Sequence, residues 1–176
     1  MAEGAREKIK RLPVTEPLSG ADTDSELFMR EAINEARAAA EKGEVPVGAV
    51  IVRDGRIVGR GRNARETGKN ALAHAEIAAI DEACRTLGGW RLPECTLYVT
   101  LEPCPMCAGA IVNARLPRVV CAVKDSKAGA FGSVLNLNAY PLNHRVDISY
   151  GVCAEEASSL LSDFFRGLRE KRLRKG

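Results

Sequence analysis

The amino-acid sequence predicts an α/β fold in which helices cover one mainly parallel or mixed sheet. Three observations lead to this prediction. Apolar residues at helical spacing alternate along the chain with short β-rich runs. The order strand, helix, strand over residues 96–123 implies a right-handed parallel crossover. The length of 176 residues, 45% of them hydrophobic, is typical of one globular domain.

The first half of the chain is predicted to form two helices with a hairpin between them. A capping-box pattern begins a helix over residues 23–43, whose apolar side chains recur at helical spacing. The β-rich stretch 45–52 precedes Asp54-Gly55, the pair that a two-residue type I′ turn prefers, and therefore predicts a hairpin. A second helical stripe covers about residues 73–87 and stops at Gly88-Gly89.

The second half is predicted to alternate strands with helices and to end in an amphipathic helix. Prolines and glycines mark the boundaries, and Pro105 suits the first turn of a helix. The predicted elements are a strand at 96–101, a helix at 105–114, a strand at 118–123, a long loop or mixed segment at 124–143, a strand around 146–150, and a final helix around 160–168 that continues into the basic end of the chain.

The sequence contains no pattern typical of export or of a membrane span. The longest uninterrupted apolar run, residues 47–52, has six residues, whereas a span needs roughly 18. Residues 1–22 contain scattered charges, prolines and glycines without the apolar stretch of a signal peptide. We therefore expect a flexible, disordered leader at 1–22, a single domain at 23–176, a cytoplasmic location and no membrane contact.

Positive charge is concentrated at the C-terminus. The formal net charge is only +3, yet residues 166–176 hold six basic side chains and one acidic one. One interpretation is a solvated helix end, where cations complement the helix dipole. The other interpretation is a surface that binds phosphate groups. Charge alone does not decide between them.

The six cysteines divide into isolated ones and one pair. Without a signal peptide, disulfides are not expected. Burial as small apolar side chains is the simplest account of most isolated cysteines, which are Cys84, Cys95, Cys121 and Cys153.

Cys104 and Cys107 form a C-x-x-C motif that follows a predicted strand and opens a predicted helix. A redox pair, half of a zinc site and chance all produce such a motif. Its place at the positive end of a helix favours the thiolate form, which is the form that binds metals. The motif therefore becomes informative only if a partner lies elsewhere in the chain.

His74-Ala75-Glu76 provides that partner at the start of the preceding predicted helix. Helices that follow neighbouring strands begin at the same edge of a sheet, so His74 and the two cysteines are expected to converge. Three ligands of N, S and S type leave zinc an open fourth position, which is the pattern of a catalytic site. A nearby carboxylate, Glu76, would then act as a general base.

These motifs resemble the zinc-dependent cytidine deaminase superfamily, whose signature is H-x-E with P-C-x-x-C. Over about residues 24–172 the chain is also similar to bacterial tRNA adenosine deaminases, the TadA family. The segments that carry this similarity are Glu44 to Val50, Thr96 to Gly109, Asp125 to Ser133 and Leu161 to Arg166.

The resemblance implies a three-layer α/β/α fold with a central mixed sheet, a homodimer, and deamination of the wobble adenosine of a tRNA anticodon to inosine. It also implies one Zn²⁺ per chain, a proton shuttle at Glu76 and a base-contacting asparagine at Asn63. The zinc ligands that it implies are His74, Cys104 and Cys107. Contacts to the RNA of the anticodon stem-loop are expected from Asp125, Arg166, Arg169, Lys171 and Arg172.

Two other functions fit parts of this pattern. A deaminase of free guanine, cytosine or a nucleotide shares the zinc motif and needs no basic C-terminus. A zinc-stabilised nucleic-acid-binding module without catalysis would have a fourth protein ligand and no use for Glu76.

Overall fold

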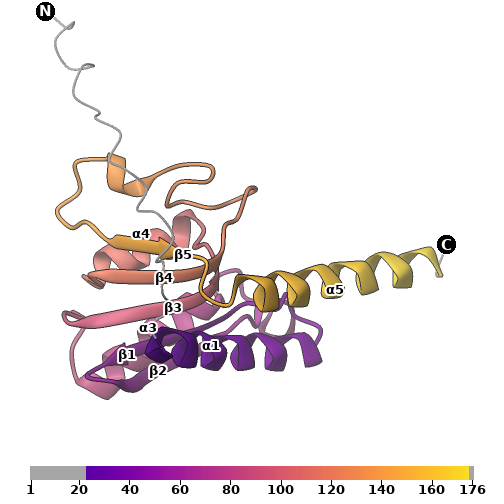
Figure 1. Ribbon diagram of the computed structural model, residues 1–176, viewed down its shortest axis with the longest axis horizontal. Coiled ribbons are helices and arrows are strands. Elements are labelled where there is room, and N and C mark those ends of the chain that lie inside the picture. The colour runs from indigo at the N-terminus through magenta and orange to yellow at the C-terminus, as the bar shows by residue number, and fades with distance from the viewer. Residues whose placement is uncertain (1–22, 175–176) are drawn as a thin grey trace, which may run out of the picture.

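The computed structural model describes residues 23–174, so the predicted leader at 1–22 lies outside the described residues (Figure 1). Five strands form one mixed sheet in the order β2-β1-β3-β4-β5. β1 is antiparallel to both β2 and β3, while β3, β4 and β5 are parallel to one another. The strands are β1 (Gly48–Arg53), β2 (Arg56–Arg62), β3 (Cys95–Leu101), β4 (Arg118–Val123) and β5 (Asp147–Tyr150).

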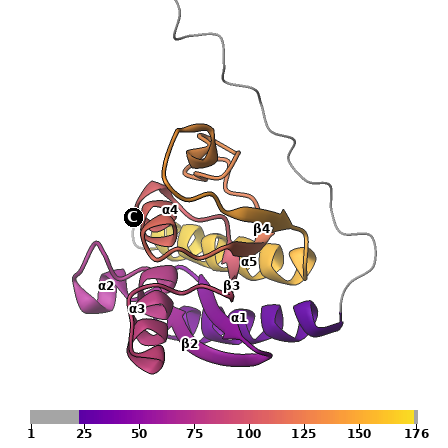
Figure 2. The same cartoon turned by 90° about the vertical axis from the view of Figure 1, so that its left-hand side faces the viewer.

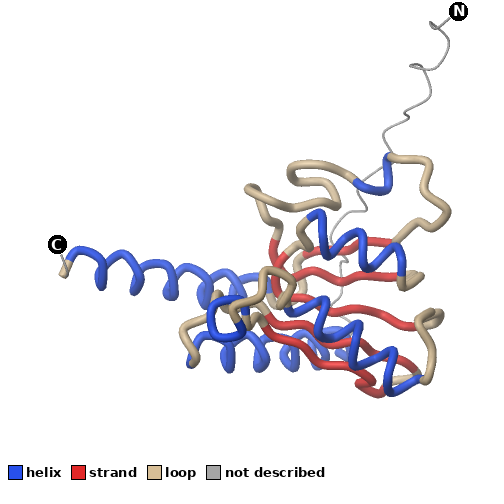
Figure 3. Tube along the Cα trace, turned by 180° about the vertical axis from the view of Figure 1, so that it is seen from behind, coloured by secondary structure: helices blue, strands red, loops and turns tan. Residues whose placement is uncertain are grey.

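Helices cover both faces of this sheet and complete the three layers that were predicted. Figure 2 shows α3 and α4 on one side of the sheet and α1 on the other. In Figure 3, which is the view from behind, α3 and α4 lie in front of the strands. The helices are α1 (Thr23–Glu41), α2 (Arg65–Gly68), α3 (Ala75–Leu87), α4 (Pro105–Asn113), the 3-10 helix η1 (Leu137–Ala139) and α5 (Ala154–Leu173).

Each face of the sheet has its own apolar core. The first joins α3 and α4 to alternate residues of the strands, such as Ile51, Leu97 and Val119. The second joins α1 and the start of α5 to the strand residues that face the opposite side of the sheet, such as Val50 and Val120. Side chains of a strand alternate between the two faces, so the same strands supply both cores.

The described hairpin and crossover agree with the sequence predictions. Asp54 and Gly55 both have positive φ angles, of 51° and 69°, as a type I′ turn requires. β3 and β4 are parallel and are joined by α4. The first strand, however, begins at Gly48 instead of residue 45, because the Val47 N–H donates to the Val45 carbonyl and turns the chain before pairing starts.

α3 packs unusually close to the sheet because β2 has glycines beneath it. A Cβ atom on Gly61 would lie 2.0 Å from the Ala75 carbonyl oxygen, and one on Gly59 would lie 2.3 Å from the Ala79 carbonyl oxygen. Any larger residue at these positions would push the helix away. The two glycines therefore set the position of the N-terminus of α3, where the H-x-E motif lies.

None of the helices within residues 23–174 is long and apolar enough to cross a membrane.

Candidate active site

The site lies where β2 and β3 end. Because β1 runs antiparallel to both neighbours, the carboxyl ends of β2 and β3 meet at the same edge of the sheet. α3 and α4 begin at this edge, and their N-cap residues are His74 and Cys104. Neither side chain caps its own helix, so both remain available for another role.

His74, Cys104 and Cys107 converge as the sequence predicted. The His74 Nδ1 atom lies 3.7 Å from the Cys104 sulfur and 3.5 Å from the Cys107 sulfur, and all three ligand atoms lie within 4.8 Å of one another. Tetrahedral zinc with Zn–N near 2.0 Å and Zn–S near 2.3 Å requires an N···S separation of about 3.6 Å. The three residues thus have the spacing of a metal-binding group, and their ligand types suit zinc.

The two thiols are electrostatically unequal. Hydrogen bonds from the Cys107 thiol and from the backbone N–H groups of Cys107 and Met106 lower the pKa of Cys104 to about 5, although burial opposes this effect. The pKa of Cys107 is raised, first by its hydrogen bond to Cys104 and then by burial. Cys104 therefore provides a ready thiolate at the start of α4, where the helix dipole also favours negative charge.

Glu76 lies in the first turn of α3 and is only 3% exposed. Burial raises its pKa to about 7, and the charge of Cys104 adds to the increase, while hydrogen bonds from its own backbone N–H and the Cys107 thiol oppose it. Its Oε2 atom has no hydrogen-bond partner among the described residues. A buried carboxylate oxygen without a partner, beside a metal-binding group, is suited to exchanging protons with a bound substrate.

These residues border a cavity of about 190 Å³. Its volume is below the roughly 300–1,000 Å³ of pockets for drug-sized ligands, so it suits a single nucleobase. The lining residues are Val45, Val47, Asn63, Arg65, His74, Glu76, Leu101, Glu102, Cys104, Asp125 and Ala128.

Asn63 lies at the end of β2 and is 8% exposed. Its Oδ1 atom accepts a hydrogen bond from the Ala75 N–H at 3.1 Å, so it satisfies one of the free N–H groups at the start of α3. This bond directs the carboxamide oxygen toward the helix and leaves the NH₂ group as the donor for a ligand. Asn63 thus lines the cavity with a hydrogen-bond donor.

Glu102 is a structural residue of the site that the sequence analysis missed. Its buried carboxylate accepts hydrogen bonds from the backbone N–H groups of Asp125, Phe131 and Ser133 and from the Ser133 hydroxyl. A Cβ atom on Gly129 would lie 2.4 Å from that carboxylate. Glu102 therefore fixes the loop 125–133 against the segment that carries Cys104.

The predicted RNA-contacting residues lie in two places. Asp125 borders the cavity, and its carboxylate accepts hydrogen bonds from the Lys127 and Ala128 N–H groups. Arg166, Arg169, Lys171 and Arg172 lie on the exposed end of α5, which extends beyond the sheet in Figure 1. Arg166 pairs there with Asp163. None of the α5 residues named above lines the cavity.

Comparison with known proteins gives one consistent result. A family model described as MafB19-like deaminase matches residues 23–169. The tRNA-specific adenosine deaminase of Bacillus subtilis (strain 168) is 53% identical over 151 residues, which cover 85% of this chain and 94% of the relative. That of Aquifex aeolicus (strain VF5) is 50% identical over 145 residues, covering 82% and 95%.

Comparison with solved structures agrees with this result. One from a study of A-to-I editing by tRNA:A34 deaminases, acting at the wobble position of transfer RNA, has a TM-score of 0.75 at 45% identity and covers 77% of this chain and 99% of its own. A guanine deaminase of Nitrosomonas europaea has a TM-score of 0.66 at 26% identity, covering 89% and 94%. The guanine deaminase thus shares the fold at much lower identity.

The three layers, the His/Cys/Cys group and the adjoining carboxylate define a deaminase of the cytidine-deaminase type. Within that class, the sequence identities to the relatives named above decide the family. The chain belongs to the family of tRNA-specific adenosine deaminases.

Proposed function

We propose that this protein is a zinc-dependent enzyme that deaminates adenosine to inosine at the wobble position of a tRNA anticodon. The observation that carries the proposal is that a His/Cys/Cys group and the unpartnered oxygen of buried Glu76 belong to one small cavity. The identity to tRNA-specific adenosine deaminases supports the choice of substrate. A tRNA substrate implies a cytoplasmic location.

His74, Cys104 and Cys107 would hold one zinc ion per chain. When bound, zinc supplies the Lewis acidity that makes water nucleophilic at neutral pH. Because two thiolates weaken that acidity, a general base beside the metal gains importance.

Glu76 would carry the protons of the reaction. It accepts a proton from the attacking water and gives it to N1 of adenine as the C6–O bond forms. It then takes the second proton from the new hydroxyl on C6 and transfers it to the amino group as the C6–N bond breaks. Water and adenosine thus yield inosine and ammonia. Asn63 would hold the base with its NH₂ group. An anticodon loop suits this small cavity, since its bases are unpaired and can be extruded at little cost.

A deaminase of free guanine is the second candidate, because a guanine deaminase shares the fold. The test uses zinc-loaded protein with an anticodon stem-loop that carries adenosine at the wobble position, and detects inosine by mass spectrometry of the nucleosides. A stem-loop with guanosine at that position is the control. Turnover of free guanine or cytosine without any inosine in the stem-loop would overturn the tRNA proposal.

We propose that the exposed basic end of α5 contacts tRNA phosphates. Replacing Arg169, Lys171 and Arg172 by alanine is expected to weaken binding of the whole tRNA and to flatten its salt dependence, because each lost phosphate contact removes about 0.7 to 0.9 from the slope of log K against log salt. Zinc content should not change. An unchanged affinity and slope in the triple variant would show that this helix end is only a solvated surface.

We also propose a homodimer, since the family implies one and a chain of 176 residues offers limited surface for both a cavity and an anticodon arm. Light scattering of the active protein at micromolar concentration should give twice the chain mass of 18.9 kDa. A single-chain mass with full activity would contradict the dimer as a requirement.

A further inference from the structure

Arg65 occupies a special place at the cavity. Among the described residues that line it, Arg65 is the one lysine or arginine. It is the first residue of the short helix α2, and it is exposed to solvent. The acidic lining residues Glu102 and Asp125 already accept hydrogen bonds from backbone N–H groups of the loop 125–133. An exposed cation thus borders a cavity that suits a neutral base.

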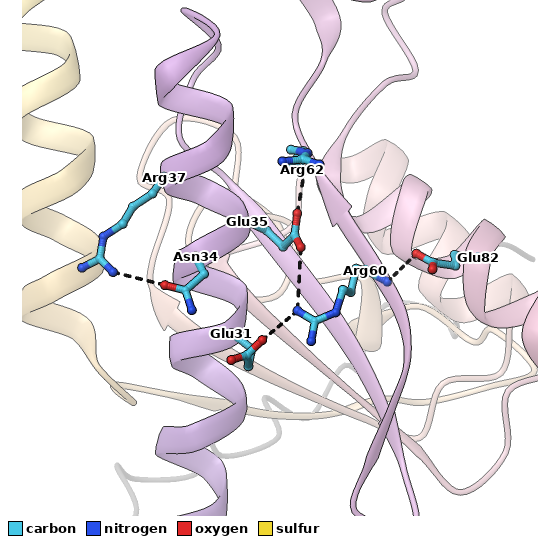
Figure 4. Close-up of polar contacts among 7 residues, drawn as sticks. All are labelled: Glu31, Asn34, Glu35, Arg37, Arg60, Arg62 and Glu82. Atoms are coloured by element: carbon cyan, nitrogen blue, oxygen red, sulfur yellow. Dashed lines mark hydrogen bonds and ion pairs between the residues drawn. The ribbon is translucent and has the colours of Figure 1, made fainter.

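The two arginines nearest to it on β2, Arg60 and Arg62, are already paired, as Figure 4 shows. Arg60 lies 2.8 Å from a Glu31 oxygen, and Arg62 lies 3.6 Å from a Glu35 oxygen. Arg65, three residues beyond Arg62, has no ion-pair partner anywhere in residues 23–174. The charge of Arg65 therefore remains available for an anion from outside the chain.

A buried carboxylate holds α2 in place. The Glu44 Oε1 atom accepts hydrogen bonds from the Thr67 N–H at 2.7 Å and from the Thr67 hydroxyl at 2.8 Å. Its Oε2 atom accepts one from the Glu66 N–H at 3.2 Å. The N-cap residue, Ala64, has no side-chain oxygen and cannot provide these bonds.

Glu44 is suited to this task because it is ionised. It is 2% exposed, and burial alone would raise its pKa, but the hydrogen bonds from Thr67 and from the backbone of Glu66 and Arg65 hold the pKa below its ordinary value. A helix of only four residues is too short to be stable alone, so its orientation depends on such external bonds. Glu44 thus determines where α2 presents Arg65.

We propose that Arg65 binds a backbone phosphate adjacent to the target nucleotide, and that Glu44 is the residue that positions Arg65 through α2. The inference rests on the proposed function and adds a source of specificity to it. Adenine carries no charge, whereas a nucleotide within RNA always has a phosphodiester beside it. Arg65 therefore favours a base within an RNA chain over a free base, and the cavity itself recognises the base.

Replacing Arg65 by alanine tests the contact. With zinc-loaded protein and an anticodon stem-loop, Kd is expected to rise about tenfold, the effect of losing one charge-assisted hydrogen bond. The slope of log K against log salt should fall by about 0.7, the contribution of one phosphate on a single strand. Arg62→Ala is the matched control, because it removes the same charge three residues away while Arg60 still pairs with Glu35. It should leave both quantities nearly unchanged.

The phosphate can be identified by neutralising it. Stem-loops with one methylphosphonate, placed on either side of the target nucleotide in turn, lack a single negative charge. One of the two should weaken binding to the unaltered protein as much as Arg65→Ala does, and Arg65→Ala protein should lose nothing further on that RNA. The proposal would be overturned if, on both RNAs, the losses of affinity caused by the methylphosphonate and by Arg65→Ala were additive. It would also be overturned if the Arg65→Ala protein kept the Kd and salt slope of the unaltered protein.

Glu44→Gln tests the positioning role. Its Kd and salt slope should change in the same direction as those of Arg65→Ala, and the double variant should be no worse than Arg65→Ala, because Glu44 acts through Arg65. A purely structural role would instead give additive losses at an unchanged slope. If unaltered protein makes no inosine from any stem-loop, the proposed function fails. If it makes inosine while Arg65→Ala binds normally, only the present inference fails.

Discussion

Replacing Glu76 by glutamine is expected to lower the rate of inosine formation by about 10²- to 10⁴-fold, the usual contribution of a general acid-base group. Glutamine preserves the size of the side chain and can still form hydrogen bonds, but it cannot accept and return a proton. The side chain is buried beside the metal-binding group, so bulk water cannot easily replace it as the proton carrier. Single-turnover kinetics on an anticodon stem-loop measures the loss.

Two further measurements separate this chemical role from a structural one. The Glu76→Gln protein should keep its zinc and its thermal midpoint, because Oε2 has no partner to lose among the described residues. Asp81→Asn removes a carboxylate from the exposed side of the same helix and should retain full activity. Near-normal turnover in the Glu76 variant would exclude this residue from the mechanism.

The parts of the fold that follow from local patterns were predicted well. Helical periodicity, the Asp54-Gly55 turn and the strand-helix-strand order each depend on residues that are neighbours in sequence. The convergence of His74 with Cys104 could also be predicted, since it needs only that two helices begin at one edge of a sheet. The structure bears out this reasoning, and the antiparallel β1 between the two strands provides the common edge.

The walls of the cavity could not be predicted in the same way. Glu44 and Glu102 each accept backbone N–H groups from segments more than 20 residues away, and a glutamate with that role has the same sequence pattern as a solvated one. The sequence analysis missed α2 because four residues are too few to show a helical period. In addition, the carboxylate that accepts hydrogen bonds from its N–H groups, that of Glu44, comes from another part of the chain. Gly61 gave no local sign that a helix carbonyl lies above it.

Replacing Cys104 by alanine is expected to remove most of the zinc, which we expect at about one ion per chain in the unaltered protein. A tetrahedral site with three protein ligands keeps only two after this change, and Cys104 is the thiol whose lowered pKa provides a thiolate most readily. Turnover should fall with zinc content. Metal analysis by mass spectrometry after dialysis against a weak chelator measures the loss, and the inosine assay measures its consequence.

Cys84→Ala is the matched control for this experiment. Cys84 is a half-buried thiol on α3 that belongs to no metal-binding group among residues 23–174, and burial raises its pKa instead of lowering it. Its removal should leave zinc content unchanged at a small cost in stability. If Cys104→Ala retained a full complement of zinc, the assignment of His74, Cys104 and Cys107 as ligands would be wrong. If zinc were lost while turnover persisted, the metal would have no part in the reaction.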